Sequence, residues 1–331
     1  MSSTTSPPIG GAKSLKARLF GAAAFRVESL LVLAVLMAIM AALSPYFLSV
    51  SNFLNIALAT ATIGVLAVGA TFVISSAGID LSVGSVLALS GVVGCQAIVA
   101  FNLPWPLGIL ACLGAGAAAG AINGALITRG DIPPFIVTLG MLGIARGFAL
   151  VLTNGLPIYG LPDPIVYLGQ GRPFGVPSPV IVLVVAALVA HVVLMHTRFG
   201  LYTQVIGDNE GAARAMGVRV ERHKVWLYTL SGAFAGLAGL LFAARVNAGD
   251  PTAGISYELT AITAAIIGGT NLFGGRGSVA GALIGALIMG VLQNGLNLLA
   301  VPSFYQQMAI GAVLILAVWL DRINRAGGRR R

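Results

Sequence analysis

Charged side chains are scarce in this sequence. Its 331 residues include 19 basic and 10 acidic ones, 9% in total, whereas about a quarter of an average globular chain is charged. Hydrophobic residues make up 57%, and the mean hydropathy is +0.95. This balance excludes an ordinary water-soluble domain and predicts an all-α polytopic membrane protein. The formal charge of +9 then indicates how the chain is oriented in the membrane, and not nucleic acid binding.

Residues that carry chemistry are also few. The two cysteines, Cys95 and Cys112, lie in apolar segments without a neighbouring cluster of His or Asp, which argues against a disulfide or a metal site. The sequence contains neither the phosphate-binding pattern GxxxxGK[ST] nor the zinc-binding pattern HExxH. We therefore predict no catalytic residue, no metal and no cofactor in this chain, and no enzymatic activity of its own.

Ionisable residues inside apolar segments are limited to Arg146 and, at the segment ends, Asp80 and Glu258. Ion-coupled carriers usually place acidic side chains inside the membrane to bind their protons or cations. The small number of such residues favours a transport path whose energy comes from another subunit.

Ten apolar segments predict ten transmembrane helices, since about 20 apolar residues cross a bilayer. They are residues 27–43, 53–75, 83–101, 107–128, 135–152, 180–195, 225–243, 259–268, 279–299 and 308–320. The fourth segment is rich in Gly and Ala, which favours close helix packing. Residues 153–179 are rich in Pro and Gly and predict a structured external loop. A membrane domain over residues 27–321 thus lies between an N-terminal tail, 1–26, and a basic C-terminal tail, 322–331.

The basic residues predict the orientation of these helices. With the N-terminus in the cytoplasm, all basic residues except Arg146, Arg172 and Arg245 fall in cytoplasmic segments. Arg146 lies within the fifth helix, and Arg172 and Arg245 lie outside. Both termini are therefore expected in the cytoplasm, which requires an even number of helices.

Two glycine-rich stretches resemble each other. Residues 78–86, GIDLSVGSV, are similar to residues 269–279, GTNLFGGRGSV, and each precedes a helix of the same predicted direction. Repeated halves are common in transporters, and glycine-rich breaks at matching places mark discontinuous helices. The similarity either records two related halves or is a chance match between glycine-rich segments.

The longest polar stretch, residues 196–224, holds eight of the charged residues. Asp208 and Asn209 are good N-cap residues, Glu210 suits the positive end of a helix dipole, and Gly217 can end a helix. A short helix is therefore expected over residues 210–216. The stretch is either a solvated connection or a docking element for a soluble partner, and the absence of an ATP-binding motif favours the second interpretation.

Several motifs resemble the ribose-type, or monosaccharide, permease family of ABC importers. They occur in collinear order between residues 50 and 321: GIDLSVGS at 78–85, GDNEGAA at 207–213 with Gly217, PTAG at 251–254 with YEL at 257–259, IGGTNL at 267–272, GGRG at 274–277 and NGLNLL at 294–299. The stretch GRPFGVPSP at 171–179 is similar to that of the ribose permeases themselves, which favours ribose or another pentose.

The resemblance implies a permease subunit of a bacterial inner membrane, paired with a second copy or a paralogue. A periplasmic sugar-binding protein would dock outside, and a cytoplasmic ABC ATPase, which uses ATP and Mg, would dock inside. The coupling helix that contacts the ATPase would comprise Gly207, Asp208, Asn209, Glu210, Ala212, Ala213, Arg214 and Gly217. Related permeases for hexoses, signalling furanosyl compounds or nucleosides remain alternatives, as do a stand-alone secondary carrier and a membrane scaffold without transport activity.

Nine residues are candidates for the translocation path or its gate, and most of them have a structural alternative. Asp80 either caps residues 81–85 or takes part in sugar recognition or gating. Arg146 either binds helix-end carbonyl groups at an interface or contacts substrate. The amides either join helices or bind sugar hydroxyls, and the aromatic rings either stack on a sugar or anchor the chain at the membrane interface. The set is Asp80, Ser82, Asn123, Phe135, Arg146, Tyr257, Asn271, Asn294 and Asn297.

Overall fold

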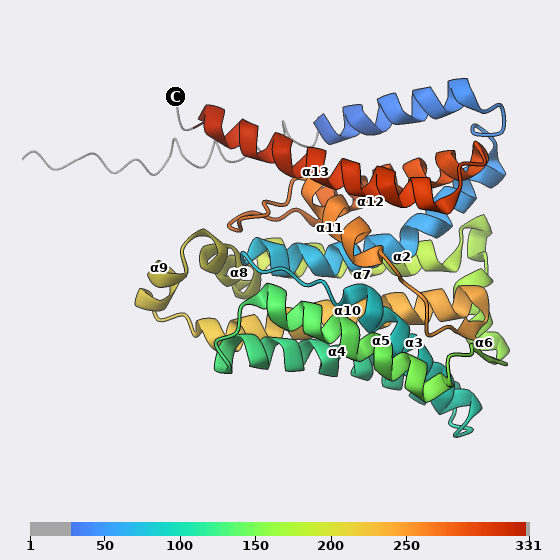
Figure 1. Cartoon of the computed structure of the whole chain (residues 1–331), viewed down its shortest axis with the longest axis horizontal. Helices are drawn as coiled ribbons and strands as arrows, with labels where there is room; N and C mark the ends of the chain where they lie inside the picture. Colours follow the sequence, from blue (N-terminus) through green and yellow to red (C-terminus); the bar gives the residue numbers. More distant parts are fainter. Residues whose placement is uncertain (1–27, 329–331) are drawn as a thin grey trace, which may run out of the picture.

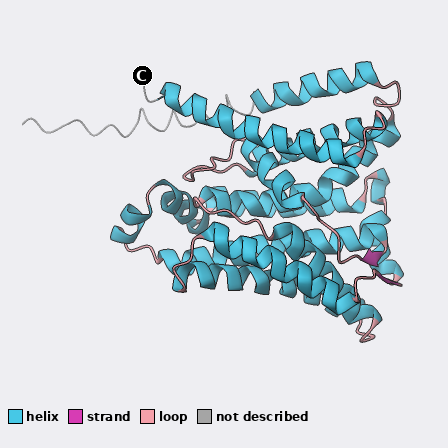
Figure 2. Ribbon diagram, in the orientation of Figure 1, coloured by secondary structure: helices cyan, strands magenta, loops and turns pink. Residues whose placement is uncertain are grey.

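The computed structural model describes residues 28–328 (Figure 1). The predicted N-terminal tail, 1–26, lies outside the described residues, as do the last three residues of the predicted C-terminal tail. The described chain is almost entirely helical, with two very short strands at one end (Figure 2). The prediction of an all-α chain is therefore confirmed.

The long helices lie side by side, with α9 at one end of the molecule and α6 at the other (Figure 1). An N-terminal helix, Glu28–Leu43, packs against α2 and α12 through Met40. The other elements are α2 (Val50–Ser75), α3 (Val83–Val99), α4 (Trp105–Arg129), α5 (Pro134–Thr153), β1 (Ile158–Tyr159), α6 (Asp163–Gln170), the 3-10 turn Pro173–Gly175, α7 (Ser178–His196), α8 (Arg198–Asp208), α9 (Glu210–Ala215), α10 (Val220–Val246), β2 (Ala248–Gly249), α11 (Tyr257–Ile267), α12 (Val279–Leu298) and α13 (Ser303–Gly328).

Local signals in the sequence set many of the helix boundaries. The Ser49 hydroxyl accepts a hydrogen bond from the Asn52 amide at the start of α2, and Ser278 does the same for the Gly281 amide at the start of α12. Proline occupies the first turn of α4, α5 and α7, where its missing N–H group would have no helical partner. The helices therefore begin where the sequence offers a cap or a proline.

Each of the ten predicted apolar segments corresponds to a helix in the described part of the chain. Six helices are long and apolar enough to cross a membrane: α2, α4, α5, α7, α10 and α12. Four more are apolar but shorter, and α11, with 11 residues, is only about 16 Å long, against about 30 Å for a bilayer core. The chain is thus a multi-pass membrane protein, while the count of ten spans stays a prediction.

The pair α4 and α10 is held together by glycines. A side chain on Gly116 would meet the carbonyl oxygen of Gly232, and one on Gly232 would meet that of Gly116. A side chain on Gly120 would meet the carbonyl oxygen of Tyr228 in the same way. The two backbones therefore touch directly, which confirms the close packing predicted for the fourth apolar segment.

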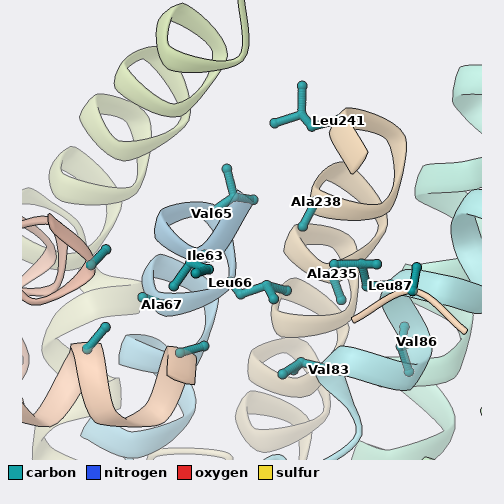
Figure 3. Close-up of a cluster of buried hydrophobic side chains, with 14 of the residues drawn as sticks. Ile63, Val65, Leu66, Ala67, Val83, Val86, Leu87, Ala235, Ala238 and Leu241 are labelled. Atoms are coloured by element: carbon teal, nitrogen blue, oxygen red, sulfur yellow. The ribbon is translucent and has the colours of Figure 1, made fainter. Parts of the chain in front are cut away.

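The main hydrophobic core lies between α2, α3 and α10. Figure 3 shows Leu66 of α2 lying between Ile63 on its own helix and Ala235 and Leu87 across from it. Leu66 is 1% exposed and Leu87 is fully buried. In contrast, α5 and α7 expose many large apolar side chains, which suits contact with lipid or with another membrane subunit.

Several boundaries differ from those predicted. Residues 196–224 are mostly helical, because α8 fills their first half and α10 begins at Val220 instead of residue 225. Helix α13 continues to Gly328 through the predicted C-terminal tail, since a helix can extend into water beyond its apolar part. The predicted external loop, 153–179, contains α6, the 3-10 turn and β1, and β1 pairs antiparallel with β2.

Candidate functional site

The helix expected over residues 210–216 is present as α9, at one end of the molecule (Figure 1). Asn209 is its N-cap, and the Asn209 Oδ1 atom accepts a hydrogen bond from the Ala212 amide at 2.9 Å. At the other end, the Gly217 amide donates to the Arg214 carbonyl at 2.9 Å, and Gly217 has a φ of 82°, which few other residues adopt. The predicted cap and stop are therefore both confirmed.

A network of charges fixes α9 against the start of α10. Glu210 accepts from Arg214 at 2.8 Å through Oε1 and from Lys224 at 2.6 Å through Oε2. Arg214 also forms an ion pair with Glu221. Lys224 and Glu221 belong to α10, so α9 is joined to the long helix that follows it by contacts as well as by the chain.

The environment of Glu210 acts on its pKa in two directions. Partial burial raises the pKa of the carboxyl group, but the hydrogen bonds and charges of Lys224 and Arg214 lower it more. The net result is a pKa below the ordinary value of 4.5. Glu210 is therefore ionised at neutral pH and keeps both partners.

One face of α9 is anchored and the other is free. Ala213 is fully buried and packs with Ile206 of α8 and Val220 of α10. Ala212 is exposed, and the side chain of Met216, directly after α9, is 66% exposed. The segment thus presents a small, partly apolar surface on a fixed base, as a docking element requires.

The base of this segment touches two other parts of the chain through the backbone. The Gly275 amide donates to the Ser75 carbonyl at 2.9 Å, which links the loop before α12 to the end of α2. Gly207, near the end of α8, packs against both groups, and a side chain there would collide with them. Asp208 lies against Gly275. We call the contact of Gly207, Ser75 and Gly275 the backbone junction.

The two glycine-rich stretches that resemble each other lie at this junction. The stretch 78–86 begins three residues after Ser75, and Gly275 lies within the stretch 269–279. Both contain non-helical residues that lead into a helix, α3 in one case and α12 in the other. The junction therefore connects α8, which leads directly into α9, to both glycine-rich stretches.

Three predicted path residues form one buried cluster. Asp80 Oδ1 accepts from the Ser82 amide at 3.0 Å and from the Ser82 hydroxyl at 2.6 Å, and the Asn123 side-chain amide donates to that hydroxyl at 3.0 Å. Asp80 Oδ2 accepts from the hydroxyl of Ser231 at 2.9 Å. The cluster joins the break before α3 to α4 and α10.

The contacts of Asp80 are those of a capping residue. It binds the amide two residues further along, and α3 begins at Val83 rather than at residue 81. Among the side chains that the structure describes, no Lys, Arg or His forms an ion pair with it. Asn123 Oδ1 is buried without a hydrogen-bond partner. A role in gating or sugar recognition stays a prediction.

Arg146 lies on α5 and reaches the segment between β2 and α11. Its Nη1 atom donates to the carbonyl oxygens of Pro251 at 2.6 Å and Ala253 at 2.8 Å. Tyr257 starts α11 just beyond this segment, with its ring 6.3 Å from that of Phe242. Of the two roles predicted for Arg146, its contacts are those of the first, which is to bind backbone carbonyl groups.

The other predicted path residues lie apart from one another. The Asn294 side-chain amide donates to Asn52 Oδ1 at 2.8 Å, and Asn297 Oδ1 accepts from Gln306 at 2.8 Å, so both join helices. Asn271 organises the turn before α12, where its Oδ1 accepts from the Phe273 amide. Phe135 is 53% exposed on α5. The nine candidates therefore do not lie together as the lining of one path.

Three residues that form these contacts are not predicted by the sequence. It indicates Lys224 only as a basic residue of a cytoplasmic segment and Gly275 only as part of the GGRG motif, and it contains no signal for Ser231. Ser231 lies 151 residues from its partner Asp80, and no short-range pattern indicates such a contact. The residues 28–328 contain no cluster of three or more His, Cys, Asp or Glu that could hold a metal ion.

The sequence of residues 52–318 matches the family described as branched-chain amino acid transport system / permease component. The chain is 45% identical over 298 residues to the ribose import permease protein of Escherichia coli (strain K12), covering 89% of this chain and 92% of that one. It is 46% identical over 294 residues to the ribose import permease protein of Bacillus subtilis (strain 168), covering 88% and 91%. It is 39% identical over 293 residues to the D-allose transport system permease protein of Escherichia coli (strain K12), covering 88% and 90%.

No solved structure matches the chain. The family match covers more than half of the sequence, and the sequences of these relatives match over about nine tenths of their length. The chain therefore belongs to the branched-chain amino acid transport system / permease component family, within which it is a ribose-type ABC importer permease.

Proposed function

We propose that this chain is the membrane-spanning subunit of an ATP-driven importer that carries a monosaccharide, with ribose favoured, into the cytoplasm. The observation that carries the proposal is α9, a capped helix that projects from a fixed base in a chain similar to ribose import permeases. A projecting helix of this kind suits contact with a soluble partner. That partner would be a cytoplasmic ABC ATPase, which would bind ATP and Mg, since we predict no ATPase site in this chain.

The proposal includes a membrane topology and an assembly. The chain would cross a bacterial inner membrane ten times as two related halves, with both termini and α9 in the cytoplasm. A second copy or a paralogue would complete the path, and a periplasmic sugar-binding protein would deliver the sugar. The apolar side chains exposed on α5 and α7 support contact with lipid or with that second subunit. No nucleic acid partner is proposed.

The backbone junction suggests how movement passes from α9 to the path. Closure of the ATPase subunits would displace α9, whose ion pairs and buried Ala213 make it move with α8 and the start of α10. Gly207 would press on the Ser75 carbonyl and the Gly275 amide, and therefore on α2 and on the loop before α12. Since close-packed interiors do not deform continuously, this displacement would shift whole helices between two arrangements.

The experiment is uptake of radiolabelled D-ribose by proteoliposomes. The vesicles contain the chain, its ATPase subunit and the sugar-binding protein, and matched vesicles omit one component each. We expect uptake only with all three proteins and ATP. Uptake by the chain alone would identify a stand-alone carrier, and no uptake by the complete system with any of D-ribose, D-allose, xylose, arabinose or a nucleoside would indicate a scaffold; either result overturns the proposal.

Competition within the same assay tests the substrate. Unlabelled D-ribose should suppress uptake at lower concentration than D-allose, xylose, arabinose or a nucleoside. Stronger suppression by one of the other compounds would leave the importer architecture in place and replace ribose as the substrate.

A further inference from the structure

A cavity of about 370 Å³ lies at the end of the molecule opposite α9. Its lining residues are Leu58, Gly169, Gln170, Arg172, Pro177 and Arg245. They come from α2, the end of α6, the α6–α7 connection and the last turn of α10, near α6 in Figure 1. The proposed topology places this end outside the cytoplasm.

The walls of the cavity are held by hydrogen bonds. Gln170 Nε2 donates to the Arg245 carbonyl at 3.0 Å, which ties α6 to the end of α10. The Ser178 amide donates to the Gly171 carbonyl at 2.9 Å, and the Ser178 hydroxyl donates to the Tyr167 carbonyl at 3.0 Å. The backbone around Arg172 and Arg245 is therefore fixed before any ligand binds.

The two arginines of the cavity have no ion-pair partner among the described residues. Among the side chains that the structure describes, all ion pairs belong to the α9 network at the opposite end. Arg146, another basic residue that does not fall in a cytoplasmic segment, donates to two carbonyl oxygens. Within residues 28–328, no hydrogen bond or ion pair involves the guanidinium group of Arg172 or Arg245, and Arg245 interacts electrostatically only with Tyr257, which carries no opposite charge at neutral pH. Two unpaired positive charges at one cavity predict an anionic ligand.

The residue next to this cavity has two unusual properties. Phe174 is fully exposed, and its φ of 56° is left-handed, a conformation that an aromatic residue rarely adopts. The turn that holds it is closed by the Gly175 amide on the Arg172 carbonyl and the Val176 amide on the Pro173 carbonyl, both at 3.1 Å. A projecting aromatic ring beside arginines is the composition found at the energetic centre of protein interfaces.

We propose that Arg172, Phe174 and Arg245 form a docking point for the soluble sugar-binding protein, whose acidic side chains enter the cavity while its apolar surface covers the Phe174 ring. This inference rests on the proposed function. A soluble acidic protein suits the site better than an anionic lipid, because Arg172 and the Phe174 ring are exposed on the turn between α6 and α7, outside the helices that could cross a membrane. The planar guanidinium groups can each bind a carboxylate through two hydrogen bonds.

The test measures the dissociation constant between the ribose-loaded binding protein and the permease–ATPase complex in nanodiscs of zwitterionic lipid. The variants are R172Q/R245Q, R172K/R245K and F174A, and the matched control is R129Q, an exposed arginine at the other end of the molecule. We expect R172Q/R245Q to weaken binding about tenfold or more and to remove most of its salt dependence. R172K/R245K should recover part of the affinity, F174A should weaken binding severalfold, and R129Q should not change it.

The outcomes separate this inference from the proposed function. Binding by R172Q/R245Q within twofold of the native complex, with equal thermal melting, overturns the docking point while ribose uptake still supports the importer. Unchanged binding together with loss of co-purified phosphatidylglycerol also overturns it, in favour of a lipid site. If thermal melting shows that R172Q/R245Q is misfolded, the dissociation constants of R172K/R245K and F174A test the inference instead. Native affinity for the binding protein in both variants overturns it.

Discussion

The two ends of the molecule use charge in opposite ways. At the α9 end, Glu210, Arg214, Glu221 and Lys224 pair with one another, and the segment is fixed in one position. At the α6 end, Arg172 and Arg245 line a cavity, and neither arginine forms an ion pair within the described chain. The comparison indicates that the charges of the first end hold α9 in place, whereas those of the second end form no ion pair in the described chain and can serve the proposed partner.

The largest expected effect comes from breaking the backbone junction at the α9 end. In G207A the added methyl group collides with the Ser75 carbonyl and the Gly275 amide, which are backbone atoms that cannot rotate away. Such overpacking costs about 1–3 kcal/mol, and we expect about tenfold or greater loss of ATP-driven uptake. Thermal melting and the uptake assay measure the two effects.

The matched control for this change is G211A, four residues further along. A methyl group on Gly211 meets only the Asn209 Oδ1 atom at 3.4 Å, and Ala favours a helix over Gly by about 1 kcal/mol. G211A should therefore melt at or above the native temperature. Equal behaviour of the two variants would contradict the assigned role of the junction.

A smaller effect is expected when the α9 charge network is broken. E210Q keeps the shape of the side chain but removes the charge that holds Arg214 and Lys224. Because the groups are partly exposed and α9 would be held less firmly, we expect about two- to fivefold weaker binding of the ATPase. Pull-down with purified ATPase measures it, and R222Q, which removes a charge with no ion pair in the described residues, is the control. An equal loss in both variants would point to general charge rather than to α9.

The same network should also respond to pH. Since the pKa of Glu210 is lowered in the folded protein, its contribution is fully present above the ordinary value of 4.5 and is lost as the pH falls through the folded value, below 4.5. ATPase binding should therefore not change through Glu210 between pH 7 and about pH 5 and should weaken below pH 4.5. E210Q should lack this step, and an identical step in E210Q would assign it to another group.

The smallest expected effect concerns the unpartnered end. F174G removes the left-handed strain at a residue whose side chain makes no described contact, while it adds flexibility to the unfolded chain. The two terms nearly cancel, so the stability should change by less than about 1 kcal/mol. Thermal melting of the permease–ATPase complex measures it. A clear destabilisation would show that Phe174 supports the fold and would weaken the contrast between the ends.

Local features of the sequence predicted local structure well. Asn209 and Gly217 were enough to place α9, because a cap and a stop act within one turn. The apolar segments located the helices, but not their full lengths, because hydropathy detects only the part that suits a membrane. Helix α6 was missed within a loop rich in Pro and Gly, although Pro164 in its first turn was an available signal.

Contacts between distant residues could not be predicted from a single sequence. The bond from Ser231 to Asp80 and the junction of Gly207, Ser75 and Gly275 bring together residues from separate helices. They depend on how the helices pack, and no spacing within one segment encodes that. The nine path candidates show the same limit. The sequence indicates which residue types could bind a sugar, but it does not indicate which of them lie close together in the folded chain.

Helix α10 joins the two contrasting ends in one uninterrupted rod. Its 27 residues span about 40 Å, with Lys224 near the start and Arg245 near the finish, and no proline lies between them. A continuous helix of this length can carry a displacement from one end of the molecule to the other. If the two proposed partners are coupled through α10, each must change the binding affinity of the other by the same factor.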